Sequence, residues 1–151
     1  DENKVHIKNE HVSGNFIQSG KEKVPSALLE LNDELKNEIH ESLRLPLENW
    51  SGVKLEPTYV YGIRDYKEGA ILIPHRDRDI THIISAIINI NQEVDEDWPL
   101  VIDDHFYRRN EVILKQGEVI FYESARLSHG RPFPLKGKSY ANIFCHFMPR
   151  K

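Results

Sequence analysis

The sequence contains little cysteine and no long apolar run, and both shortages narrow what the chain can be. One cysteine, Cys145, among 151 residues excludes an internal disulfide and is the usage expected in a reducing compartment such as the cytoplasm. No apolar stretch reaches the length that crosses a bilayer, and no secretory segment is evident, so we expect no membrane association. The sequence begins with Asp1, which leaves an upstream segment open.

Basic charge is also scarce. The 20 Lys and Arg residues are outnumbered by 24 Asp and Glu, giving a net charge of −4, and they form no stripe. A nucleic-acid-binding protein would normally show a basic footprint, so we expect no nucleic-acid partner. A composition of 39% hydrophobic and 29% charged residues is that of a globular protein, and the length fits one domain. The oligomeric state stays open.

Hydrophobic periodicity predicts one helix followed by many short strands. Leucines and isoleucines at three- and four-residue steps predict a helix from Pro25 that ends before Pro46. Extended pieces are expected at 4–7 and 11–18, before the helix. Short runs rich in β-branched and aromatic residues predict strands at 58–63, 70–75, 83–90, 100–103, 111–115, 118–122, 129–131 and 139–147.

Gln116 and Gly117 predict a hairpin turn between the fifth and sixth of these strands. We therefore expect a single catalytic domain over residues 1–151, with residues 1–50 supplying terminal strands and a supporting helix, and residues 55–151 forming the β core. About eight strands after one helix favour a sandwich or small barrel.

The first candidate functional residues lie at the end of the strand 70–75, where His75 is followed two residues later by Asp77. Side chains two apart on an extended backbone point to the same side, so both could bind one ion. With eight histidines in the chain, a chance pair is expected more often than a metal site, so this pair alone is weak evidence. His129, in the turn-rich segment Ser128-His129-Gly130-Arg131-Pro132, supplies a possible third ligand.

Two histidines and one carboxylate form the facial triad that binds Fe(II) and leaves open positions for substrate and dioxygen. A zinc hydrolase could use the same ligand types. Lys138 separates these readings, because an ammonium pointing into an apolar pocket requires an anion, such as the far carboxylate of a dicarboxylic co-substrate. The alternative for Lys138 is a hairpin lysine that reaches solvent.

From Tyr59 to the C-terminus this pattern resembles the iron(II)/2-oxoglutarate dioxygenases, in particular the peptidyl prolyl 4-hydroxylase-like branch. The resemblance implies a double-stranded β-helix, or jelly-roll, with an N-terminal helix packed on one sheet. It implies that His75, Asp77 and His129 bind Fe(II) and that Lys138 binds 2-oxoglutarate with help from Tyr66. Further residues that it suggests are Asn89 for the co-substrate and Phe144 and His146 for the substrate. Arg131 is another candidate for the substrate side, and a solvated loop charge is its alternative.

The implied reaction is hydroxylation of a peptidyl residue, proline to 4-hydroxyproline, with dioxygen consumed, succinate and CO2 released, and ascorbate as the reductant. The expected partner is a proline-containing peptide or protein. Relatives in the nucleic-acid-repair branch carry a further Arg where this chain has Phe144, which argues against repair. Phe144 also replaces the usual Trp, Leu72 replaces a substrate-contacting Tyr, and the intervals from His75 to His129 and from His129 to Lys138 are short.

Two other functions stay open. Short intervals favour a 2-oxoglutarate oxygenase that acts on a free amino acid or another small molecule. A jelly-roll module that retains a metal but has no oxygenase activity is the third possibility. Tyr59, Tyr61 and Asn142 are further candidates for lining the pocket, whereas we expect structural or surface roles for the remaining histidines and a packing role for Cys145.

Overall fold

The structure is a computed structural model that describes residues 7–9, 17–19, 26–77 and 83–150. Within these residues the chain forms one helix, α1, and eleven strands. The helix spans Asp33–Ser51. The strands are β1 (Ile7–Asn9), β2 (Ile17–Ser19), β3 (Ser26–Leu29), β4 (Leu55–Lys67), β5 (Ala70–His75), β6 (Ile84–Val94), β7 (Leu100–Asp103), β8 (Arg109–Val112), β9 (Val119–Tyr122), β10 (His129–Arg131) and β11 (Gly137–Pro149).

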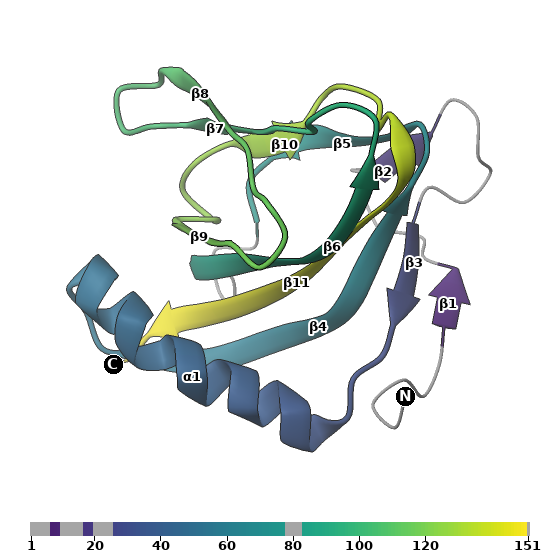
Figure 1. Cartoon of the computed structure of the whole chain (residues 1–151). Helices are drawn as coiled ribbons and strands as arrows, with labels where there is room; N and C mark the ends of the chain where they lie inside the picture. The colour runs from purple at the N-terminus through teal and green to yellow at the C-terminus, as the bar shows by residue number, and fades with distance from the viewer. Residues whose placement is uncertain (1–6, 10–16, 20–25, 78–82, 151) are drawn as a thin grey trace.

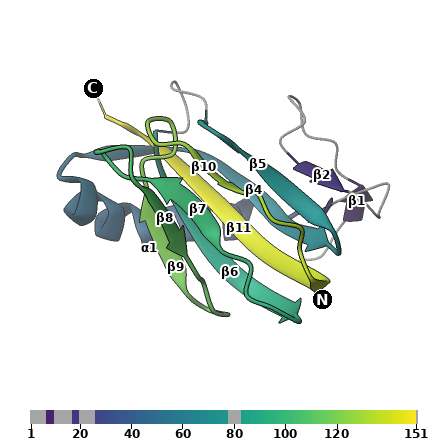
Figure 2. The same ribbon diagram turned by 90° about the horizontal axis from the view of Figure 1, so that it is seen from above.

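Two antiparallel sheets lie face to face, and α1 covers the outer face of the larger one (Figure 1). The six-stranded sheet has the order β1-β3-β4-β11-β6-β9, and the five-stranded sheet has the order β2-β5-β10-β7-β8. Seen from above, strands of the two sheets run in similar directions, which is the aligned packing of a β-sandwich (Figure 2). The expected mainly β architecture with a helix on one sheet is confirmed.

Each face of the six-stranded sheet has its own apolar cluster. Between the sheets, Tyr66, Tyr122 and Tyr140 of the larger sheet pack with Trp98, which precedes β7, and with Leu100 and Ile102 of β7 in the smaller sheet. On the outer face, leucines and isoleucines of α1 pack against Cys145 and other residues of β4, β6 and β11. Cys145 is buried in this outer cluster, so the predicted packing role agrees with its position.

Both predicted ends of the helix are wrong. Residues 26–29 form β3, and the helix begins after Asn32, whose side chain accepts a hydrogen bond of 2.8 Å from the Leu35 backbone amide. It continues through Pro46 to Gly52, which ends it in the left-handed conformation at φ 78°. Proline inside a helix costs about 3 kcal/mol, and the burial of Leu47, 0% exposed, offsets that cost.

The predicted hairpin around Gln116 and Gly117 is also wrong. A turn is present, with Gly117 at φ 85° and the Glu118 amide donating to the Lys115 carbonyl at 3.0 Å. However, β8 pairs with β7 and β9 pairs with β6, so the turn carries the chain from one sheet to the other. A turn residue fixes the local backbone but not the partner of the strand that follows.

The predicted strands at 70–75, 100–103 and 129–131 have the observed bounds of β5, β7 and β10. Most of the extended pieces expected at 4–7 and 11–18 lie outside the described residues. The residues described in this region, 7–9 and 17–19, form strands. In the described part of the chain, no helix is both long enough and apolar enough to cross a membrane.

Candidate metal centre

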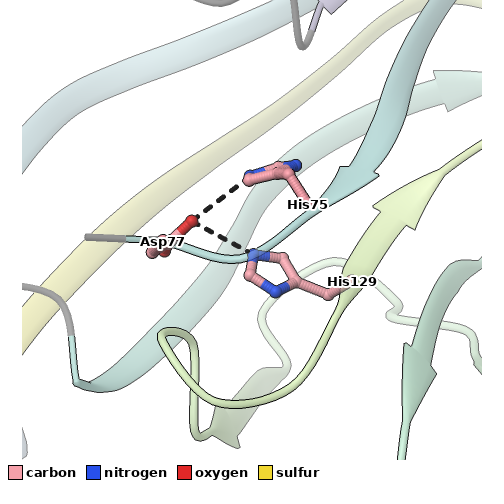
Figure 3. A group of neighbouring side chains, drawn as sticks. All are labelled: His75, Asp77 and His129. Carbon is pink, nitrogen blue, oxygen red and sulfur yellow. Dashed lines mark ion pairs between the residues drawn. The ribbon is translucent and has the colours of Figure 1, made fainter. Parts of the chain in front are cut away.

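The structure brings His75, Asp77 and His129 together, with one ligand atom from each lying within 4.8 Å of the others. His75 ends β5 and His129 begins β10, and the two residues are directly opposite in the antiparallel pair. Asp77 follows β5 by two residues. Its Oδ1 lies 3.2 Å from His75 Nε2 and 3.3 Å from His129 Nε2. Dashed lines in Figure 3 mark these two ion pairs.

The second ring nitrogen of each histidine is already engaged by backbone. His75 Nδ1 lies 2.8 Å from the Ile73 carbonyl oxygen, and His129 Nδ1 lies 3.0 Å from the Leu127 carbonyl oxygen. Because a carbonyl only accepts, each Nδ1 is the donor, which leaves Nε2 as the metal-binding atom in the neutral ring. Two Nε2 atoms that face one carboxylate require a shared cation, either a metal ion or protons.

Asp77 is suited to be an anionic ligand. Burial raises the pKa of Asp77, but the adjacent His129 and His75 rings, which hydrogen-bond to its carboxylate when protons take the place of the metal ion, outweigh burial and hold that pKa below its ordinary value. Its backbone amide donates to the Ser124 carbonyl at 2.8 Å, which ties the segment after β5 to the loop between β9 and β10. The carboxylate is therefore charged at neutral pH and held in place.

Gly130 allows the two histidine-bearing strands to approach each other. A Cβ at this position would lie 2.7 Å from the backbone N and Cα of Pro74 and 2.8 Å from the Leu72 carbonyl oxygen. Such distances are well inside van der Waals contact, so only glycine fits without moving the backbone. The spacing of β5 and β10, and with it the pairing of His75 with His129, depends on this residue.

Lys138 does not point into this site. Its side chain is 81% exposed, and its Nζ lies 3.9 Å from Glu93 Oε1 at the surface. The pairing of β11 with β6 shifts between Gly137 and Ser139, so Lys138 is the extra residue of a bulge, and the expected alternation fails there. The alternative of a lysine that reaches solvent describes its position, and the structure does not support its expected role in binding a co-substrate.

A different cation lies inside the sandwich. Arg131, two residues after His129 on β10, is 1% exposed, and its guanidinium lies 4.9 Å from the Trp98 ring centroid and 4.7 Å from that of Tyr140. Its Nη1 donates to the Trp98 carbonyl, whereas Nη2 has no hydrogen-bond partner among the described residues. Tyr66, expected beside the co-substrate, also packs on Trp98, at 5.1 Å.

A buried guanidinium with only neutral contacts in the described part of the chain is energetically costly, and an anion would offset the cost. Two residues advance a strand by about 7 Å, comparable to the length of a five-carbon diacid. The residues therefore fit a metal ion at the mouth of the sandwich and a carboxylate deeper inside it.

Tyr122, whose ring packs edge-on against His129 at 4.9 Å, lies in the same interior cluster. Burial raises the pKa of Tyr122, so it is a neutral hydroxyl.

The comparisons with known proteins agree with this architecture. No protein-family model matches the chain, and no curated protein matches it in sequence. Among solved structures, a Pseudomonas putida prolyl-4-hydroxylase superposes with a TM-score of 0.61 at 17% identity, covering 89% of this chain and 78% of its own. A viral collagen prolyl hydroxylase from Paramecium bursaria Chlorella virus-1, in complex with 2-oxoglutarate, gives 0.58 at 14% identity, with coverage of 87% and 76%.

A 2-oxoglutarate-Fe(II) oxygenase family protein from Burkholderia pseudomallei gives a TM-score of 0.59 at 9% identity, covering 80% of this chain and 61% of its own. The chain has the jelly-roll fold of the iron(II)/2-oxoglutarate oxygenases. The resemblance found in the sequence is thus confirmed at the level of fold. Because these identities are low, the comparisons show the fold alone, and any activity of this chain has to be argued from its own residues.

Three other residues expected at the site, Asn89, Phe144 and His146, are buried. Asn89 donates to Asn142 Oδ1 at 2.9 Å and accepts from Gln92 Nε2 at 3.1 Å, so protein groups engage its amide. Phe144 belongs to the cluster between the sheets, with the Arg64 guanidinium 5.1 Å from its ring centroid. His146 is hydrogen-bonded to Ser85. The roles of Asn89, Phe144 and His146 toward co-substrate or substrate stay predictions.

Several histidines lie away from the centre, as expected. His40 Nε2 lies 3.3 Å from the His146 carbonyl oxygen, and His105 pairs with Glu123 at the surface. His6, His11 and His82 lie outside the described residues. Sequence reasoning missed Trp98 and Tyr122, as well as Ser85 on β6 and Ser124 in the loop after β9. No local sequence pattern distinguishes isolated serines that have a role.

Proposed function

We propose that the protein is a non-haem Fe(II)/2-oxoglutarate-dependent oxygenase that hydroxylates a peptidyl residue, proline in the first place, and releases succinate and CO2. The observation that carries the proposal is the convergence of His75 Nε2, His129 Nε2 and the Asp77 carboxylate. Bound iron and 2-oxoglutarate would supply the oxidation of an unactivated C–H bond by dioxygen, and ascorbate would keep the iron reduced. The chain supplies ligand geometry and a dry interior.

In this proposal Arg131, and not Lys138, pairs with the far carboxylate of 2-oxoglutarate. Burial, the unsatisfied Nη2 and the position two residues beyond His129 support this assignment. An arginine offers a planar fork that can bind both carboxylate oxygens, and the aromatic rings on it exclude water. Arg131 was expected on the substrate side, and its interior position favours the co-substrate role instead.

Binding of 2-oxoglutarate tests this assignment without turnover. Calorimetric titration of the anaerobic Mn(II)-loaded protein should show that Arg131→Met weakens 2-oxoglutarate binding about 10- to 150-fold, the range for a lost charge-assisted hydrogen bond of about 1.5–3 kcal/mol. Lys138→Ala, the matched control, should bind within about twofold of wild type because the lysine is exposed. A reversed order of the two variants would return the role to Lys138.

The reaction itself is tested by measuring succinate release with Fe(II), ascorbate and a panel of proline-rich peptides, with product masses recorded. Hydroxylated peptide at +16 Da and matching succinate are expected. A free amino acid or other small molecule is the second candidate substrate, favoured by the short interval between His75 and His129, and free proline belongs in the same panel. A metal-loaded protein with no turnover and no 2-oxoglutarate binding would instead be a binding module.

A further inference from the structure

Three buried polar side chains, Ser85, Ser124 and His146, form a hydrogen-bonded chain close to the metal centre. The Ser85 hydroxyl contacts the Ser124 hydroxyl and lies 2.5 Å from His146 Nδ1. The two serines are 0% exposed and the histidine is 2% exposed. Buried polar groups are costly unless they are paired, and here each pairs with the next.

This hydrogen-bonded chain of three side chains joins the six-stranded sheet to the loop between β9 and β10. Ser85 lies on β6, where its neighbours across the sheet are His146 on β11 and Tyr122 on β9. Ser124 lies two residues after the end of β9, in the loop 123–128 that leads to β10 in the other sheet. The hydrogen bonds therefore fix this loop to the larger sheet at the point where the chain changes sheets.

The same loop holds two of the three ligands through its backbone. The Ser124 carbonyl accepts from the Asp77 amide at 2.8 Å, and the Leu127 carbonyl accepts from His129 Nδ1 at 3.0 Å. A third contact, from Arg76 Nε to the Arg126 carbonyl at 2.9 Å, ties the segment before Asp77 to the loop. A shift of the loop would move Asp77 and turn the His129 ring together.

We propose that Ser85, Ser124 and His146 are positioning residues, which set the loop 123–128 and through it the placement of Asp77 and the ring angle of His129. This inference rests on the proposed metal centre and identifies the residues that hold two of its ligands in position. It also gives His146 a task that differs from substrate contact, because its Nδ1 is directed at Ser85. Outer partners that orient ligands typically change metal affinity 10- to 100-fold when they are lost, so we expect roughly that range here.

Co(II) binding tests the inference, because affinity and the visible ligand-field spectrum both report ligand geometry without turnover. Ser85→Ala and His146→Leu should each weaken Co(II) binding about 10- to 100-fold and change the spectrum. His146→Asn, whose amide lies where Nδ1 lay, should stay within about threefold of wild type. Ser139→Ala is the matched control, since it removes another serine hydrogen bond, 2.5 Å to Asp65 Oδ1, elsewhere on β11.

Thermal unfolding of the apo proteins separates positioning from stability. If His146→Leu unfolds at the working temperature, His146→Gln, whose amide lies where Nε2 lay, is compared with His146→Asn, and tighter Co(II) binding by the Asn variant is expected. Equal affinities of these two, or wild-type affinity and spectrum in Ser85→Ala, would overturn this inference alone. A wild-type protein that binds no Co(II) would overturn the metal centre and this inference together.

Discussion

Replacing Gly130 by alanine should damage the metal centre more than it damages the fold. The new Cβ would lie 2.7 Å from Pro74 N and Cα, whereas carbon atoms in contact lie about 3.5–4.0 Å apart. Strands β5 and β10 must therefore separate locally by about 1 Å, and overpacking of this kind costs about 1–3 kcal/mol. Metal–ligand distances are tolerated within only about 0.2 Å, so we expect Gly130→Ala to lower metal affinity at least about tenfold.

The assay is Co(II) or Fe(II) affinity by competition with a chelator, measured beside the thermal stability of the apo protein. Val101→Ala is the control, because Val101 lies opposite Gly130 on β7 and is 4% exposed. Removing its methyl groups should cost about 1–3 kcal/mol without pressing the strands apart, and metal affinity should stay within about threefold. Wild-type metal affinity in Gly130→Ala would refute the claim that this glycine sets the distance between the two histidines.

Three further predictions follow from packing and burial. Burial raises the pKa of the Cys145 thiol to about 12, so the native protein should not react with Ellman's reagent at pH 8, and the unfolded protein should react fully; rapid native labelling would contradict this. The same raised pKa means that this thiol lowers the free energy of unfolding as pH rises from about 9 toward 12, which a comparison with Cys145→Ala across that range would reveal. Leu47→Ala should cost about 2–5 kcal/mol of stability in urea unfolding, because Leu47 is fully buried beside Pro46; a loss below about 1 kcal/mol would show that its packing does not offset the proline.

The sequence predicted most of the β core because the signals there are local. Strands β5 and β7 are apolar runs bounded by turn residues, and their ends were predicted correctly, as were those of the short polar strand β10. The helix was misplaced because Leu28, which lies in β3, was included in its apolar stripe and Pro46 was taken as its end. The Asn32 cap followed by Asp33 and Glu34 was a start signal that the sequence did contain.

The sequence predicted the part of the site that depends on local signals. His75 and Asp77 share a strand end, so their proximity follows from the local sequence, whereas the position of His129 opposite His75 depends on a long-range strand pairing that no local pattern encodes. Lys138 was misplaced because alternation along β11 was extended through a bulge that no residue pattern marks. Arg131 had been singled out, but its burial between Trp98 and Tyr140 depends on packing of the two sheets.

The central claim is that three distant side chains bind one metal ion, and Fe(II) titration of the anaerobic apo protein tests it most directly. We predict one equivalent bound by the wild type, and no binding in His129→Ala, although this variant should still fold because the side chain lies at the end of a short strand. Equal Fe(II) binding by wild type and His129→Ala, or none by either, would contradict the account.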